Sequence, residues 1–98
     1  MPKKNLTLKR LTKIMKDIAG DEKVGESSDN DVIVRKGSHL SENALFVVIV
    51  ECSNLYYLLN GYWDNCDWEE HTKLTEALQE YGMFWEWYDS CCFHVYES

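Results

Sequence analysis

Apolar and basic positions alternate with a helical period near the start of the chain. From Leu8 to Ile18 the apolar residues recur every three or four positions and fall on one arc, while the lysines and Arg10 fall on the opposite arc. Thr7 is a suitable N-cap, and Gly20 follows the last apolar position. The pattern predicts an amphipathic helix over 7–19.

A second amphipathic helix is predicted over 68–81. Its apolar face carries five residues at helical spacing: Trp68, His71, Leu74, Leu78 and Tyr81. Its outer face carries Glu69, Glu76 and Glu80. Asp67 and Glu70 have the spacing of a capping box, and Gly82 follows the helix.

Strand patterns fill most of the remaining chain. The β-branched run at 32–34 predicts a short strand before Gly37. The segment at 44–52, which is apolar from Ala44 to Val50, predicts a central strand covered on both faces. Residues 83–96 read as a hairpin around Asp89-Ser90. In that hairpin we expect three opposed pairs, which are Trp87 with Cys92, Trp85 with His94, and Phe84 with Val95.

Two segments between these elements have less regular patterns. Residues 54–60 fit either a short helix started by Ser53 or a strand leading into an Asn60-Gly61 hairpin turn, and we favour the strand because its tyrosines suit a pleated surface. The polar stretch at 20–31 predicts a flexible exposed loop.

Together these patterns predict one α+β domain over residues 1–98. We expect four to six short, mainly antiparallel strands packed against the two amphipathic helices. A chain of 98 residues has enough apolar content, 45%, for one core and is too short for two.

Charge is divided between the two parts of the chain. Six cations and no acid precede Asp17, whereas residues 37–98 contain one lysine and eleven acids. The net charge of −7 argues against direct nucleic-acid binding, because phosphate recognition needs a basic surface. The basic helix could lie on an anionic membrane, but a small sheet needs both helices as its cover, so we expect no membrane role.

The cysteine and histidine positions form no established motif. Whether Cys66, His71, Cys92 and His94 converge is open, and their spacing lacks the close ligand pairs of structural zinc sites. Adjacent Cys91 and Cys92 do not resemble a redox motif. We assign no catalytic residue, metal ligand or cofactor. Lysines interrupt the only candidate signal segment, so we expect a cytoplasmic protein with reduced thiols.

The aromatic residues are the strongest functional signal. All thirteen lie from Phe46 onward, which is more large apolar surface than a small domain buries easily. One sheet face is therefore expected to bind a protein partner or a second copy of the chain. The predicted partner-binding residues are Trp85, Trp87, His94, Tyr96, Glu69, Glu76 and Glu80.

The sequence thus favours a non-enzymatic protein-interaction module, expected to be homodimeric. One alternative is an acidic mimic of nucleic acid that inhibits a DNA- or RNA-binding protein, with the acids of the second half in place of phosphates. Another is a small-ligand-binding protein or enzyme with a pocket near His71 or His94.

Overall fold

Helix α1, Leu8–Ala19, forms where the apolar spacing predicts it. The computed structural model describes residues 5–38, 40–59, 68–89 and 91–98. Thr7 caps the helix, since its Oγ1 accepts the N–H of Arg10 at 3.1 Å. Gly20, at φ +69°, ends it in a conformation that favours glycine. Leu11 and Met15 are fully buried, so this helix covers the core as expected.

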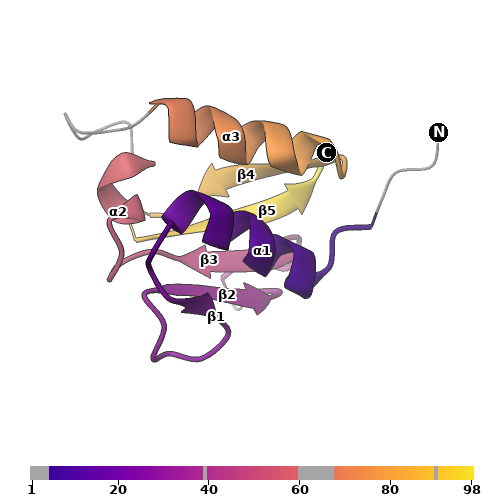
Figure 1. The fold of residues 1–98 in the computed structure, drawn as a ribbon. Helices are drawn as coiled ribbons and strands as arrows, with labels where there is room; N and C mark the ends of the chain where they lie inside the picture. The colour runs from indigo at the N-terminus through magenta and orange to yellow at the C-terminus, as the bar shows by residue number, and fades with distance from the viewer. Residues whose placement is uncertain (1–4, 39, 60–67, 90) are drawn as a thin grey trace.

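Five strands form a single mixed sheet (Figure 1). They are β1 (Val24–Gly25), β2 (Val32–Lys36), β3 (Phe46–Ile49), β4 (Met83–Trp87) and β5 (Cys92–Glu97). Their order across the sheet is β1-β2-β3-β5-β4, with β1 parallel to β2 and the other neighbours antiparallel. The predicted α+β class is confirmed.

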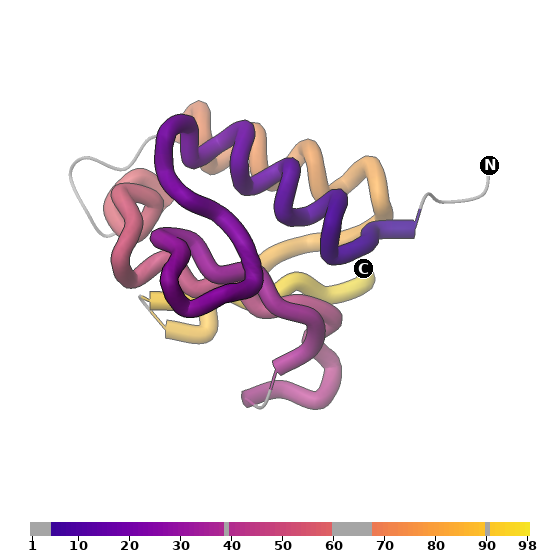
Figure 2. The backbone as a smooth tube through the Cα atoms, turned by 60° about the horizontal axis from the view of Figure 1, so that its bottom comes forward, coloured from indigo at the N-terminus to yellow at the C-terminus, as the bar shows by residue number. Residues whose placement is uncertain are grey.

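Both long helices cover the same face of the sheet. Helix α1 contacts β1 and β2, helix α3 (Trp68–Gln79) contacts β4, and the two helices contact each other. Figure 2 shows them on one side of the strands, with the segment after β2 extending on the other side. The core lies between the layers, where Val34, Val48 and Phe93 are fully buried. In the described part of the chain, no helix has the length and apolar content needed to cross a membrane.

Residues 55–58 form a short helix, α2 (Leu55–Leu58), so the favoured strand prediction is wrong. Leu55 and Leu59 are both fully buried, and a four-residue spacing places them on one side of a helical turn. Ser53 supports the start, because its Oγ accepts the N–H of Leu55 at 3.0 Å. The proposed Asn60-Gly61 turn and the Asp67 cap lie outside the described residues.

Strand β3 is central in the sheet, as predicted, but it is shorter and covered on one face only. Phe46 and Val48 are buried beneath the helices, whereas Val47 and Ile49 are half-buried on the other face. The expectation of a strand covered on both faces is therefore wrong. Both long helices lie on the same side, and in the described part of the chain no helix covers the opposite side.

The C-terminal hairpin pairs one residue out of the predicted register. Phe84 pairs with Tyr96, Trp85 with Val95, and Trp87 with Phe93. The carboxylate Oδ1 of Asp89 accepts the N–H groups of Cys91 and Cys92, at 2.7 and 3.0 Å, which lengthens the turn. Ser90 lies outside the described residues.

The polar segment at 20–31 contains β1 and is therefore more than a loop. Val24 is buried and pairs with Val32 in the parallel register. The N–H of Lys23 donates to the carboxylate of Asp31 at 3.0 Å, which ties the two ends of the intervening loop together. The flexibility of this segment and the single-domain organisation stay predictions.

Candidate functional site: the open sheet face

The face of the sheet opposite the helices is named here the open face. Successive side chains of a strand point to opposite faces, so the register assigns its members. On β2 and β3 they are Ile33, Arg35, Val47 and Ile49. On β5 and β4 they are Cys92, His94, Tyr96, Phe84 and Glu86.

Large apolar side chains are exposed on and around the open face. Leu45 precedes β3 and is 38% exposed, Phe84 on β4 is 41% exposed, and Tyr88 just beyond β4 is 51% exposed. The ring of Phe84 stacks on that of Tyr96, with centroids 5.4 Å apart. Several large apolar side chains exposed on one face favour a binding site there.

One row across the open face carries opposite charges at its two ends. Arg35 pairs with Val47, Val47 with His94, and His94 with Glu86. Arg35 and Glu86 are both exposed, and strands β3 and β5 lie between them. The row therefore runs from a cation through an apolar centre to an acid.

The segment between β2 and β3 folds over the middle of the open face. Ser38 Oγ lies 2.9 Å from Nε2 of His94, and Nδ1 of His94 lies 3.1 Å from the Tyr96 hydroxyl. That hydroxyl donates to Ser41 Oγ at 3.5 Å. A neutral His94 protonated on Nδ1 satisfies every partner, because it donates to Tyr96 and accepts from Ser38. His94 is only 1% exposed, so these bonds bury the ring under the segment.

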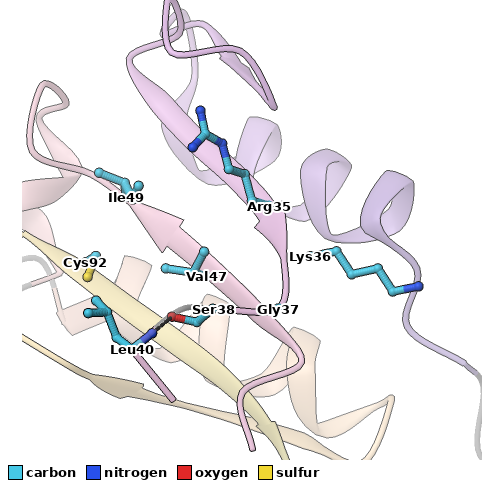
Figure 3. A pocket seen from close by; sticks show the side chains of 8 residues that line it. All are labelled: Arg35, Lys36, Gly37, Ser38, Leu40, Val47, Ile49 and Cys92. Carbon is cyan, nitrogen blue, oxygen red and sulfur yellow. Dashed lines mark hydrogen bonds between the residues drawn. The ribbon is translucent and has the colours of Figure 1, made fainter. Parts of the chain in front are cut away.

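A hollow of about 370 Å³ lies beside this segment on the open face. Its walls are Val47, Ile49, Cys92 and Leu40, and Arg35 lies at its rim (Figure 3). Leu40 is 54% exposed, so an apolar side chain also projects from the segment itself. The hollow can accept an apolar side chain of a partner.

The thiol of Cys92 has low reactivity. Burial, followed by the charge and hydrogen bond of Asp89 and the nearby Cys91, raises its pKa to about 11. The thiol therefore stays protonated at neutral pH and acts as an apolar wall of the hollow. Cys52 and Cys92 are free thiols.

The structure separates the predicted partner-binding residues into three groups. His94 and Tyr96 lie on the open face, whereas Trp85 and Trp87 lie on the helix-covered face, packed against the core. Trp85 donates its Nε1–H to Thr75 Oγ1 on α3 at 2.9 Å. Trp85 therefore helps to hold α3 on the sheet.

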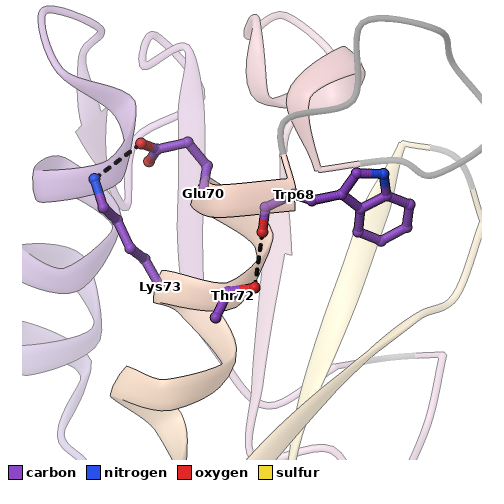
Figure 4. A network of polar contacts seen from close by, with 4 residues as sticks. All are labelled: Trp68, Glu70, Thr72 and Lys73. Atoms are coloured by element: carbon purple, nitrogen blue, oxygen red, sulfur yellow. Dashed lines mark hydrogen bonds and ion pairs between the residues drawn. The ribbon is translucent and has the colours of Figure 1, made fainter.

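The predicted acids form a third group on the outside of α3. Glu69, Glu76 and Glu80 are exposed there, away from the open face. Lys73 on the same helix pairs with Glu70 at 3.1 Å. Figure 4 shows this ion pair on one side of α3 and the indole of Trp68 projecting on the other.

Trp68 was expected on the buried face of its helix but is 60% exposed. Its ring contacts that of His71, which in turn contacts Trp85, with centroid separations of 5.0 and 4.8 Å. Burial between these rings lowers the pKa of His71 below its ordinary value. A shallow hollow of about 300 Å³ includes His71 and Glu86 at the β4 edge of the sheet.

The candidate metal ligands lie on different faces. His71 is on the helix side of the sheet, and Cys92 and His94 are on the open face. Cys66 lies outside the described residues. In the parts of the chain that the structure describes, no three side chains of the ligand types are close enough to hold a metal ion.

Sequence reasoning missed Arg35, Leu40, Val47 and Ile49 as members of a site. Val47 and Ile49 were assigned to the core because their strand is apolar at every position. Only the placement of both helices on one side exposes them.

Comparisons with protein-family models, with curated proteins and with solved structures find no match.

Proposed function

We propose that this chain is a non-enzymatic protein-interaction module that binds a second copy of itself through the open face. The observation that carries the proposal is the apolar surface of that face, on which Leu45, Phe84 and Tyr88 remain exposed. Burying such surface against a partner removes it from water and stabilises the complex.

The polar groups of the open face support binding over catalysis. A serine hydroxyl beside an imidazole can be a nucleophile and its base. Here, however, Ser38 Oγ also accepts the N–H of Leu40 at 3.1 Å, and the second nitrogen of His94 meets the Tyr96 hydroxyl and no carboxylate. These bonds fix the segment over the sheet. Among the described residues, every buried polar side-chain atom has a partner.

A second copy is favoured over an unrelated partner because the open face carries complementary charges on its own two sides. Arg35 and Glu86 are both exposed at opposite ends of one row. A surface of this kind is suited to a copy of itself. We also propose a cytoplasmic location, because thiols stay reduced in that compartment.

Sedimentation equilibrium and light scattering from low to high micromolar concentration test the proposal. We expect a concentration-dependent monomer–dimer equilibrium. Leu45→Glu and Phe84→Glu introduce charge where the side chains are already exposed, so each variant should fold and shift the equilibrium toward the monomer. Gln79→Glu, which adds the same charge to the exposed side of α3, is the matched control.

Circular dichroism melts of the three variants show whether they fold. A wild-type chain that stays monomeric at every concentration contradicts the proposal. So does a dimer that survives both open-face substitutions, because its interface must then lie elsewhere.

A further inference from the structure

We infer that the two copies pair around a two-fold axis that runs parallel to the strands between the facing sheets, with Arg35 of each copy opposite Glu86 of the other. The inference rests on the proposed function and adds to it the orientation of the dimer and the pair of residues that selects it.

The charged row supplies the first argument. Arg35 on β2 and Glu86 on β4 are separated by β3 and β5, and the strand spacing places their backbones about 14 Å apart. Val47 and buried His94 occupy the middle of the row. Turning the row end to end therefore places the Arg35 end of one copy over the Glu86 end of the other.

Two directions of the two-fold axis bring the open faces together with the charged row of one copy over that of the other. An axis parallel to the strands exchanges the β2 side with the β4 side, so Arg35 faces Glu86 twice. An axis perpendicular to the strands and in the same plane keeps each side over itself, so Arg35 faces Arg35 and Glu86 faces Glu86. Like charges opposed across an interface are unfavourable, which favours the parallel axis.

The shape of the open face agrees with the same axis. The segment after β2 lies over β5, because Ser38 bonds to His94 there, and it raises that half of the face. The hollow lies beside this segment, and its lining includes Val47 and Ile49 on β3, Cys92 on β5 and Leu40 of the segment itself (Figure 3). Exchange of the two sides brings the raised segment of one copy toward the hollow of the other, so that the exposed part of Leu40 can pack against Val47 and Ile49 of the second copy.

Arg35 is positioned to act as an interface residue. Its Nε–H donates to the carbonyl of Glu26 at 3.1 Å, which holds the side chain along β2. An arginine carries five N–H donors, so the terminal nitrogens can bind a carboxylate in two-pronged geometry. The neighbouring Lys36 also lines the hollow, and its side chain extends away from Val47 in Figure 3.

Charge exchange tests the orientation. Arg35→Glu alone opposes two acids at both contacts, and Glu86→Arg alone opposes two arginines, so we expect each to raise the dimer dissociation constant roughly tenfold or more at low salt. The double variant restores opposite charges and should dimerise like the wild type. An equimolar mixture of the two single variants should form the heterodimer in preference to either homodimer, as native mass spectrometry can measure.

Lys13→Glu is the matched control, because it makes the same charge change on the exposed side of α1, away from the open face. It should leave dimerisation unchanged. The double variant has the wild-type charge and also shows whether both substituted sites tolerate folding.

The outcomes separate this inference from the proposed function. If Arg35→Glu instead pairs preferentially with the wild type, Arg35 faces Arg35, and the perpendicular axis replaces the one inferred here. A dimer insensitive to all charge exchanges overturns the orientation while the open-face dimer stands. A wild-type chain that never dimerises overturns both.

Discussion

The Oγ of Ser38 lies 2.9 Å from Nε2 of His94, although 56 positions separate them in the chain. This bond joins the segment after β2 to strand β5 and buries the imidazole. It therefore links the shape of the open face to one hydroxyl group.

Replacing Ser38 with alanine should destabilise the fold and loosen the segment. The substitution leaves Nε2 of buried His94 without its partner, and an unsatisfied buried polar atom costs about 1–3 kcal/mol. Urea unfolding measures the loss, and amide hydrogen exchange at 40–45 measures the loosening. Ser28→Ala, on an exposed loop, is the control. Unchanged exchange at 40–45 would show that the bond does not hold the segment.

Among the described residues Phe93 is the largest fully buried side chain, and its replacement by alanine should be strongly destabilising. Its ring meets Trp85 and Trp87 edge-on, with centroids 4.9 and 5.6 Å away. Removing a buried phenylalanine ring costs about 3–5 kcal/mol, which is a large part of the stability of a small domain. Urea unfolding followed by tryptophan fluorescence measures the change.

The stability of Phe93→Leu should lie between those of the wild type and Phe93→Ala. Phe93→Leu can still be measured if the alanine variant does not fold. Phe84→Ala removes the same ring from an exposed position and should change stability far less. Equal losses at positions 84 and 93 would contradict the assigned burial.

Acidification should destabilise the protein partly through His71. Burial lowers the pKa of this histidine in the folded state below its ordinary value of 6.5. Below that value the unfolded chain binds a proton more readily than the folded chain, so stability falls as pH falls. Free energies of unfolding at about pH 7.5 and about pH 5.5 should therefore differ less in His71→Gln than in the wild type. An identical pH dependence in both proteins would exclude this contribution.

Cys92 should resist alkylation compared with Cys52. The raised pKa of the Cys92 thiol, about 11, leaves little thiolate at mildly alkaline pH, and the side chain is buried, whereas Cys52 is exposed. Timed treatment with iodoacetamide and peptide mass spectrometry should show Cys52 modified first. In denaturant the difference should disappear, and a persistent difference would mean that the fold is not its cause.

Glu22 should contribute to stability through the start of α2. Its carboxylate accepts the Ser53 hydroxyl at 2.8 Å and the N–H of Asn54 at 3.1 Å, which connects the chain after α1 to that short helix. Glu22→Ala should cost about 1–2 kcal/mol in urea unfolding, as the loss of a helix cap does. Asp21→Ala, at the exposed neighbouring position, should cost less. A larger loss of stability for Asp21→Ala than for Glu22→Ala would contradict this role of Glu22.

The two long helices could be predicted because their signals are local. Thr7 and Gly20 bound α1, and the spacing around Leu74 and Leu78 marks α3 without reference to the rest of the chain. Residues 55–58 misled the prediction because tyrosines favour strands in general. Burial of Leu55 and Leu59 against the core, which is a tertiary effect, decides for the helix.

The open face could be predicted only in part. The alternation of Trp and Phe on β4 indicated two different faces, but the sequence does not say which face the helices cover. The extra turn residue set by Asp89 also shifted every cross-strand partner by one position. Trp85 and Trp87 consequently moved from the predicted binding site to the core.

Strand β5 is the last of the described strands along the chain, yet it lies inside the sheet between β3 and β4. During synthesis on a ribosome, the edge of β3 that pairs with β5 stays unpaired until residues 92–95 have been made, because residues 46–49 pair with them. The pairing closes a long loop, which slows folding. Until β5 emerges, the nascent chain exposes an unpaired apolar strand. The chain is most prone to aggregate during this interval.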